Sequence, residues 1–488
     1  MSHDELAYAS IPALGGMLRS GATTSVELTK FFLDRLETIG PRYNCVVTLT
    51  RAVALNQAAA ADRELRAGKD RGPLHGIPYG AKDLLATKGI PTTWGCAPYK
   101  TRVIDRDATV VTRLRDAGAV LAAKLAMVEL AGGMGYRQAN ASLTGPGLNP
   151  WDPSLWSGGS SSGSGSAVAA GLVPFAIGTE TWGSITTPCS FCGLTGLRPT
   201  YGRVSRSGAM ALSWTLDKVG PMTRSAHDCG LVLDAIAGPD PDDPSASDRP
   251  YQYPPAENPG RQFKLAILKD GVAKAHPDVK AHFERALAVM KTFASVDEIE
   301  TPDLPFGPTA STILAAEAAS AYEEMVESGL VFELTAPEDR IGGFADQAVL
   351  ATEYLRAQRL RGRLCRALDA WFEPYDAVLT VATGGPAPTA FGGFRGAFYG
   401  AKSLGGPGNV CGTPALVMPT GLTKEGLPTS IQLDGRAYSE NRLLAVALAF
   451  QEASAWHQDR PDLDKAFEKA KSHKKSLEKK QRDGHGGD

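Results

Sequence analysis

Hydrophobic positions along the first part of the chain alternate between a helical period and short, continuous apolar runs. Between residues 6 and 65, apolar side chains recur every three or four positions, which predicts a helical N-terminal layer. Residues 74–82 are extended in pattern and punctuated by Gly and Pro, so we expect a strand that ends at Lys82. A helix from residue 107, a turn and an apolar strand at 119–123 follow.

The segment from residue 140 to 166 breaks this alternation. Residues 140–157 have no regular period and carry several turn-forming pairs, which predicts a surface loop. Residues 157–166 consist only of Ser and Gly, as a flexible linker does. A compact helix at 167–171 and a buried strand at 173–178 follow directly. Because a flexible linker does not usually lead straight into core elements, we expect an ordered turn here.

The second half of the chain returns to alternating elements, and residues 238–260, rich in Pro and Asp, are the best candidate for a boundary or an excursion. We expect strands at 265–268, 375–381, 415–418 and 430–433, and helices at 279–293, 310–330, 344–372 and 441–455. This alternation predicts an α/β layered fold with a largely buried sheet.

We expect a single large domain over residues 1–460. Its parts are a helical layer at 1–65, a core at 70–240, and a second half at 260–460 that contributes the substrate pocket. Residues 464–488 carry Lys-rich runs without an apolar pattern, which predicts a solvated helix that frays into a disordered, charged tail.

Composition narrows the function classes. The 488 residues are 43% hydrophobic and 21% charged, which is an ordinary globular mixture. With 51 Lys and Arg against 53 Asp and Glu, no excess charge attracts nucleic acid or an anionic membrane. The longest near-apolar run, residues 167–178, is too short to span a bilayer, and the N-terminus lacks a secretory signal. We therefore expect a cytoplasmic protein with neither a nucleic-acid nor a membrane partner.

The seven cysteines are an odd number in a long chain, which fits reduced thiols better than a disulfide framework. Cys189 and Cys192 form a C-x-x-C pair, but no second pair and no nearby His completes a zinc site. We expect both to be small buried side chains, and no metal site.

Two common glycine motifs do not explain the Gly/Ser segment. Neither a phosphate-binding P-loop nor a dinucleotide fingerprint occurs between Gly158 and Gly171, which disfavours nucleotide binding. Residues 159–163 do match Gly-x-Ser-x-Gly, the nucleophile turn of α/β hydrolases. That motif needs a preceding strand, whereas residues 149–153 have a turn sequence, so this interpretation ranks second among hydrolases.

Three longer segments carry a more specific pattern: Gly158-Gly159-Ser160-Ser161, residues 178–185 (GTETWGSI) and residues 193–205 (GLTGLRPTYGRVS). The chain resembles the amidase signature family in these segments. The likeness continues through residues 216–224 and, upstream, through Gly76-Ile77-Pro78 with Lys82-Asp83. It is strong over about residues 70 to 240 and fainter near Gly412. The resemblance implies an α/β/α layered sandwich around a mixed β-sheet, acting without a metal or organic cofactor.

The resemblance also assigns roles. It makes Ser184 the nucleophile, Ser160 the bridging serine that follows a cis peptide bond after Gly159, and Lys82 the terminal base. The backbone of Thr181, Trp182, Gly183 and Ser184 would form the oxyanion hole, and Gly132, Gly133 and Met134 would bind the acyl group. Met134 is equally well explained as core.

The proposed roles have a physical reason. A serine hydroxyl needs a base to take its proton, and none of the eight His lies within the Gly/Ser region or beside Ser184. A lysine can serve if burial keeps its amine neutral. Without the family likeness, Lys82 would be read as a surface lysine.

Three positions depart from the family pattern without touching the triad. Glu180 stands where many members have Asp, and Trp182 stands where they have Gly; we expect the Trp182 ring to pack inward. Thr186 replaces the usual Arg two positions after the nucleophile, which weakens the case for glutamine and favours an apolar or aryl amide.

We therefore expect an amidase that hydrolyses small carboxylic amides to acid and amine through a serine acyl-enzyme, with esters, anilides and carbamates as open further substrates. The family also implies a homodimer. The alternative in the same fold is the glutamine-hydrolysing A subunit of a tRNA-dependent amidotransferase, which needs partner subunits. A binding protein without turnover is a third alternative, against which Lys82, Ser160 and Ser184 all argue.

Overall fold

The fold is known from a computed structural model that describes residues 3–254 and 262–471. Within these residues no helix is both long and apolar enough to cross a membrane. Residues 463–471 are helical, as expected for the start of the tail, and the rest of the predicted tail lies outside the described residues.

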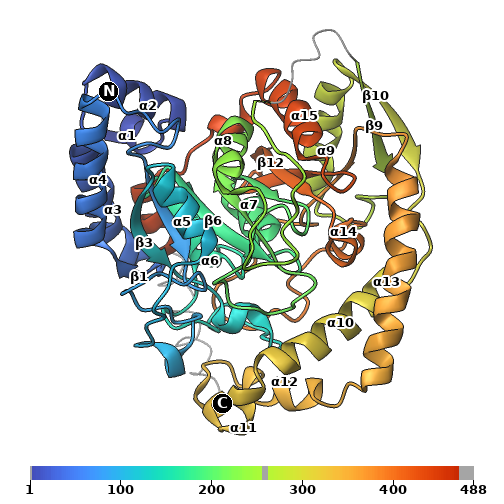
Figure 1. Cartoon of the computed structure of the whole chain (residues 1–488). Coiled ribbons are helices and arrows are strands. Elements are labelled where there is room, and N and C mark those ends of the chain that lie inside the picture. The colour runs from blue at the N-terminus through green and yellow to red at the C-terminus, as the bar shows by residue number, and fades with distance from the viewer. Residues whose placement is uncertain (1–2, 255–261, 472–488) are drawn as a thin grey trace, which may run out of the picture.

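Four helices stand along one side of the molecule, within the segment where the sequence predicts a helical layer (Figure 1). They are α1 (His3–Ala7), α2 (Ile11–Ser20), α3 (Ser25–Thr38) and α4 (Arg51–Arg66), and the short strand β1 (Val46–Leu49) lies between the last two. Helix α3 begins at a capping box, in which the Thr24 side chain accepts from the Glu27 N–H and the Glu27 carboxylate accepts from the Thr24 N–H.

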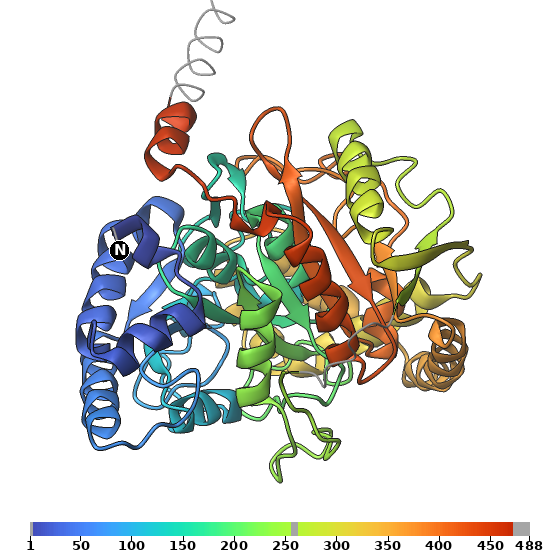
Figure 2. The same cartoon turned by 90° about the horizontal axis from the view of Figure 1, so that it is seen from above.

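Eleven strands of the described residues form one mixed sheet that runs through the whole molecule (Figure 2). In spatial order they are β1 (Val46–Leu49), β3 (Val120–Leu125), β2 (Pro78–Lys82), β6 (Phe175–Glu180), β8 (Lys218–Thr223), β7 (Thr195–Arg198), β12 (Ala415–Leu422), β13 (Pro428–Asp434), β11 (Ala377–Thr380), β9 (Phe263–Leu268) and β10 (Ala294–Ile299). Strand β2 is parallel to both of its neighbours, whereas β6 and β8 are antiparallel. The mixed sheet that the family likeness implied is therefore present.

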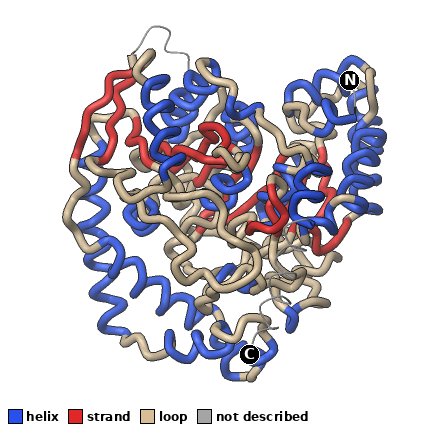
Figure 3. Tube along the Cα trace, turned by 180° about the vertical axis from the view of Figure 1, so that it is seen from behind, coloured by secondary structure: helices blue, strands red, loops and turns tan. Residues whose placement is uncertain are grey.

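Helices cover both faces of the sheet, which gives the expected α/β/α sandwich (Figure 3). One face packs on α5 (Thr109–Asp116), α8 (Ala226–Ile236), α9 (Pro277–Met290) and α15 (Glu440–Glu452). The other packs on α4, α6 (Ser162–Ala169) and α7 (Thr186–Cys192). Beyond β9 and β11 a further apolar cluster joins α10 (Phe306–Ala321), α13 (Ala351–Phe372) and α14 (Gly405–Cys411).

The structure corrects several predicted boundaries. The predicted loop at 140–157 contains a short hairpin of β4 (Leu148–Asn149) and β5 (Asp152–Trp156). Helix α6 begins at Ser162, inside the Gly/Ser segment, because its glycines allow close packing: a Cβ on Gly163 would lie 2.4 Å from the Ala126 backbone nitrogen.

The two long predicted helices in the second half are each interrupted. The first ends at Ala321 and is followed by α11 (Glu323–Glu327), and the second divides into α12 (Asp339–Asp346) and α13. Strand β10 was not predicted, because its alternate residues include exposed acids that hide an apolar pattern.

Residues 238–254 leave the sheet and run as turns and bends without a helix or strand. The sheet itself continues past this excursion, since β7 of the first half pairs antiparallel with β12 of the second, Ala415 opposite Arg198. The two halves of the chain therefore share one layer of strands.

Candidate active site

Lys82 ends strand β2 and is completely buried. Its Nζ donates a hydrogen bond to Ser160 Oγ at 2.7 Å and another to Thr179 Oγ1 at 2.9 Å. Thr179 lies on β6, and the parallel pairing of β2 with β6 places the ends of the two strands side by side. The end of β2 thus lies beside Ser160, and Lys82 and Ser160 are in direct contact.

The environment of Lys82 favours its neutral form. Burial lowers the pKa of its amine from the ordinary value to about 7, although the negative charges of Asp217 and Glu180 oppose this shift. A lysine with such a pKa carries a free lone pair in a large part of the molecules at neutral pH. It can therefore accept a proton through the Ser160 hydroxyl.

Ser160 is buried and follows a cis peptide bond from Gly159, as the family likeness implied. Its carbonyl accepts a hydrogen bond from the Val128 N–H at 3.0 Å, which fixes the backbone between the hairpin and α6. The Gly/Ser segment is therefore a packed turn and not a linker.

Ser184 lies in the turn between β6 and α7, and its side chain is 7% exposed. Gly183 just before it has a φ of 84°, a left-handed conformation that favours glycine. The Ser184 carbonyl accepts from the Ser161 N–H at 3.3 Å, which ties this turn to the Gly/Ser segment. Within residues 3–254 and 262–471 the Ser184 hydroxyl has no hydrogen-bond partner, Ser160 included.

The backbone N–H groups of Trp182, Gly183 and Ser184 donate to no acceptor in the part of the chain that the structure describes. Three neighbouring N–H groups without internal partners can receive an oxyanion. The same turn that presents the Ser184 hydroxyl thus also presents these donors.

The sequence analysis noted Glu180 only as a departure from the family pattern, but the structure places its carboxylate at the turn that carries Ser184. Its Oε2 accepts hydrogen bonds from the Ile185 N–H at 2.9 Å and from the Thr186 N–H at 3.0 Å. The carboxylate therefore caps the N-terminus of α7 and closes the loop that carries Ser184. An acid four positions before a serine that precedes a helix is the sequence pattern that would have indicated this role.

A buried network holds Glu180 in place. Its Oε1 accepts from Arg198 Nη1 at 2.9 Å and from Asn409 Nδ2 at 3.0 Å, and Asn409 in turn accepts from Lys218 Nζ at 2.7 Å. Burial alone would raise the pKa of Glu180, but the charges of Arg198 and Lys218 and the backbone N–H bonds lower it to about 2. The carboxylate is therefore ionised throughout the physiological range.

Trp182 does not pack inward, so that expectation is wrong. The residue is 40% exposed, because the turn between β6 and α7 presents its tip outward. Its ring lies over α14, where a Cβ on Gly406 would be 3.3 Å from Trp182 Cζ2.

The segment expected to bind the acyl group begins at the last residue of a short 3₁₀ helix, η3 (Glu129–Gly132), in which Leu130 and Ala131 have left-handed φ values. A Cβ on Gly133 would lie 2.3 Å from Leu212 Cδ1. Met134 is 3% exposed and belongs to the main apolar core. Its burial fits the core role, and the acyl-binding role of this segment stays a prediction.

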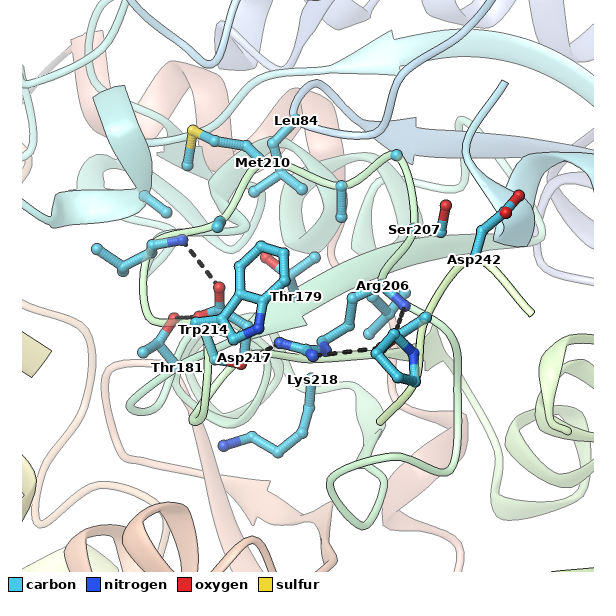
Figure 4. A pocket seen from close by; sticks show the side chains of 18 of the residues that line it. Leu84, Thr179, Thr181, Arg206, Ser207, Met210, Trp214, Asp217, Lys218 and Asp242 are labelled. Atoms are coloured by element: carbon cyan, nitrogen blue, oxygen red, sulfur yellow. Dashed lines mark hydrogen bonds and ion pairs between the residues drawn. The ribbon is translucent and has the colours of Figure 1, made fainter. Parts of the chain in front are cut away.

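Figure 4 shows side chains that line a cavity of about 160 Å³, and the three residues of the proposed triad are not among its lining residues. Thr179, the second partner of Lys82, lines this cavity together with Thr181, which lies in the turn between β6 and α7. A wider, mainly apolar cavity of about 800 Å³ adjoins it, since both share Met210 and Trp214.

Asp217 fixes the wall of the smaller cavity. Its Oδ1 accepts from Thr181 Oγ1 at 2.5 Å, and its Oδ2 accepts from the Leu212 N–H at 2.8 Å. Burial raises the pKa of Asp217, against the effect of these hydrogen bonds. Asp217 thereby links the turn that carries Ser184 to the loop that carries Trp214.

Within the described ranges, no group of three or more His, Cys, Asp or Glu side chains could hold a metal ion. Cys189 and Cys192 are buried in α7 and unpaired, as predicted.

The mixed sheet, the buried lysine, the serine after a cis peptide and the second serine on a strand-to-helix turn form the arrangement that the family likeness implied for an amidase. The Amidase family model matches residues 27–444, and the chain belongs to this family.

The curated relatives of the chain include an amidotransferase subunit and an amidase. The chain is 36% identical to the A subunit of the glutamyl-tRNA(Gln) amidotransferase of Moorella thermoacetica, across 94% of this chain and 99% of that protein. It is 35% identical to a putative amidase AmiD of Mycobacterium bovis, across 94% and 97% of the two chains.

Solved structures similar to this chain likewise include an amidase and an amidotransferase subunit. The native peptide amidase of Stenotrophomonas maltophilia superimposes with a TM-score of 0.79 and is 30% identical, over 92% of this chain and 97% of that one. The A subunit of the glutamyl-tRNA(Gln) amidotransferase of Thermotoga maritima gives a TM-score of 0.72 at 26% identity, over 88% and 92% of the two chains.

Proposed function

We propose that this chain hydrolyses carboxylic amides to acid and amine through an acyl-enzyme on Ser184. The observation that carries the proposal is the 2.7 Å hydrogen bond between a fully buried Lys82 and Ser160, with burial holding the pKa of the amine at about 7. A neutral amine within hydrogen-bond distance of a serine hydroxyl can act as its base, and within the described residues Lys218, the other buried lysine of this region, contacts Asn409 and no serine.

In the acylation step, the Ser184 oxygen attacks the amide carbonyl while its proton passes to Ser160, whose own proton passes to Lys82. Backbone N–H groups of the predicted oxyanion hole, Thr181, Trp182, Gly183 and Ser184, receive the oxyanion of the tetrahedral intermediate. The proton then returns through Ser160 to the nitrogen of the leaving amine, and the carbon–nitrogen bond breaks. Water attacks the resulting ester, using the same proton path in reverse, and releases the acid.

A serine-reactive phosphonate, mapped by mass spectrometry, tests the nucleophile. We expect one adduct on Ser184 in the wild type and none in Ser184→Ala. Ser161 is the matched control because its Oγ donates to the Thr179 carbonyl at 3.2 Å and is already occupied. An adduct on Ser161, or none at all, would remove this mechanism.

A second candidate function is the glutamine-hydrolysing component of a tRNA-dependent amidotransferase. The sequence relatives favour it, since the A subunits of two such amidotransferases are 36% and 37% identical over 93% or more of this chain. The loop that carries Ser184 favours the amidase, because Thr186 stands where the family usually has Arg. Thr186 is buried, and its hydroxyl and N–H both donate to the Glu180 carboxylate. Position 186 thus offers no charge to a polar substrate.

The two candidates differ in what the purified chain does alone. An amidase turns over a simple aryl amide without any partner and prefers it to glutamine. An amidotransferase component prefers glutamine and depends on partner subunits. Measuring ammonia from glutamine and amine from an aryl amide on one preparation, with Ser184→Ala as the blank, separates them. Light scattering on that preparation also tests the homodimer that the family likeness implies.

A further inference from the structure

Two of the seven cysteines stand apart from the others. Cys365 on α13 and Cys411 at the end of α14 are each half-buried, whereas the remaining five are buried. Neither belongs to the active-site network. A cysteine that is both accessible and close to a second thiol is a candidate for oxidation chemistry.

The two side chains meet where α13 packs on α14. Cys365 Sγ lies 3.9 Å from the carbonyl oxygen of Cys411, within sulfur hydrogen-bonding distance. Leu364 and Val410, the residues preceding the two cysteines, belong to the same apolar cluster, which keeps the two helices in register.

A basic side chain fixes the position of this pair. Arg361 Nε donates to the Val410 carbonyl at 2.7 Å, and its Nη2 donates to the Thr215 carbonyl at 2.8 Å. The guanidinium therefore stands beside both cysteines, one turn before Cys365 on α13. A fixed positive charge next to a thiol stabilises its thiolate form.

We propose that Cys365 and Cys411 are a peroxide-reactive pair that closes into an intramolecular disulfide linking α13 to α14.

The chemistry balances in two steps. The Cys365 thiolate attacks one oxygen of a peroxide, so a sulfur–oxygen bond forms, the oxygen–oxygen bond breaks, and hydroxide leaves. The sulfur is oxidised by two electrons to a sulfenic acid and the peroxide is reduced. The Cys411 thiol then loses its proton and attacks the Cys365 sulfur, forming the disulfide and releasing the hydroxyl group as water.

The electrostatics assign the attacking role to Cys365. The hydrogen bond from the Cys411 thiol lowers the pKa of Cys365 to about 7 against the effect of burial, and the charges of Arg361 and Arg366 lower it further. The same hydrogen bond raises the pKa of Cys411, which fits a resolving thiol. Burial raises the pKa of the five other thiols, so they stay protonated and unreactive.

The test uses the reduced full-length chain, treated with a slight excess of hydrogen peroxide, blocked with N-ethylmaleimide in denaturant and digested with trypsin. Cleavage after Arg363 and Arg366 leaves Cys365 in the three-residue peptide 364–366, and Cys411 lies in the peptide 403–424. We expect a disulfide to join these two peptides. The joined species should have the summed mass of the two reduced peptides less two hydrogens, and a reductant should separate it. The five buried cysteines should all carry maleimide and so serve as internal controls.

Two variants assign the order of the steps. Cys411→Ser should leave a Cys365 sulfenic acid that dimedone traps, with no joined peptide, and Cys365→Ser should react at least tenfold more slowly with peroxide. In the wild type, the rate should rise about tenfold between pH 6 and 8 and then level off, since the thiolate of a group with a pKa near 7 is then fully formed.

Maleimide on both Cys365 and Cys411 after peroxide treatment would overturn the proposal in the wild type itself, whatever the variants do. So would a covalent dimer in place of the internal link. Neither result involves Ser184, so failure of the disulfide proposal would leave the proposed amide hydrolysis untouched.

Discussion

Lys82 can take a proton only while its amine is neutral, which makes amide hydrolysis depend on pH. Because burial lowers its pKa to about 7, the amine is protonated and inactive well below pH 7 and neutral above it. We expect kcat/KM for an amide to rise with pH to a plateau, with its midpoint near 7. A pH-rate profile from pH 5 to 9 measures this, and a rate that is flat across pH 6–8 would contradict the assignment.

Replacing Lys82 should also separate two classes of substrate. The amine of an amide leaves only when it is protonated, whereas an ester can lose its alkoxide more easily. We expect Lys82→Ala to lower amide hydrolysis by about 10²- to 10⁴-fold and hydrolysis of a matched ester much less. Equal losses on the two substrates would count against return of the proton through Ser160.

Glu180 is the residue whose loss should damage both stability and turnover. Its carboxylate holds Arg198 in the interior and caps the loop of Ser184, and removing one partner of a buried ion pair costs about 3–5 kcal/mol. We expect Glu180→Gln to lower both the free energy of unfolding and kcat.

Asp434→Asn is the matched control for Glu180→Gln. Asp434 lies 3.7 Å from the same Arg198 but makes no hydrogen bond to the Ser184 turn. It should destabilise the protein while changing kcat far less than Glu180→Gln does. If both variants lose stability and kcat in the same proportion, Glu180 has no positioning role beyond the ion pair.

At the residue scale, several parts of the candidate site could not be predicted from the sequence alone. Lys82, Ser160 and Ser184 were chosen from the family likeness, because no spacing in the chain relates a strand end to two turns that lie 78 and more positions away. The partners of Glu180 come from β7 and α14, as far as 229 positions away, so its role could be read only from the fold. The exposure of Trp182 depended on which way a turn faces, and a residue type alone does not determine that.

At the scale of elements, glycines inside helices differ according to what their backbone touches. A Cβ on Gly163 of α6 would lie 2.4 Å from the Ala126 nitrogen and 2.5 Å from the Cys45 carbonyl, whereas a Cβ on Gly362 of α13 would meet nothing within 4 Å. We expect Gly163→Ala to destabilise the protein by about 1–3 kcal/mol through overpacking. We expect Gly362→Ala to stabilise it by about 0.5–1 kcal/mol.

Thermal unfolding of both variants checks this difference, since both exchange the same residue types within a helix. Opposite shifts of the melting temperature are expected. A Gly163→Ala protein as stable as the wild type would mean that α6 can move away from the sheet edge.

Element prediction succeeded for buried strands with a continuous apolar run and failed for others. The central strands β7 and β8 are buried throughout but were not predicted, because Gly, Pro and charged residues interrupt their apolar pattern. Strands β3 and β6 are buried throughout and were found within about two residues of their bounds. Edge strand β10 is half-exposed and was missed. Helix α6 was predicted to begin five residues late, because a Gly/Ser segment has no side-chain pattern and its helical state depends on packing against neighbouring backbone.

At the scale of the whole molecule, we propose that the chain behaves as one cooperative domain. Strands β7 and β12 pair across the boundary that the composition at 238–260 suggested, and Arg198 on β7 contacts both Glu180 on β6 and Asp434 on β13. These contacts lie inside one sheet, so neither half can unfold without exposing the strand edge and the buried charges of the other.

Equilibrium unfolding in urea tests this cooperativity directly. We expect the helix signal in far-ultraviolet circular dichroism and the tryptophan fluorescence to change in one coincident transition, because tryptophans lie in both halves of the chain. Arg198→Ala should move that transition to lower urea and, by removing the charge shared between β6 and β13, pull the two signals apart. Two separate transitions in the wild type would instead show that the halves fold independently and that the shared sheet contributes little to their coupling.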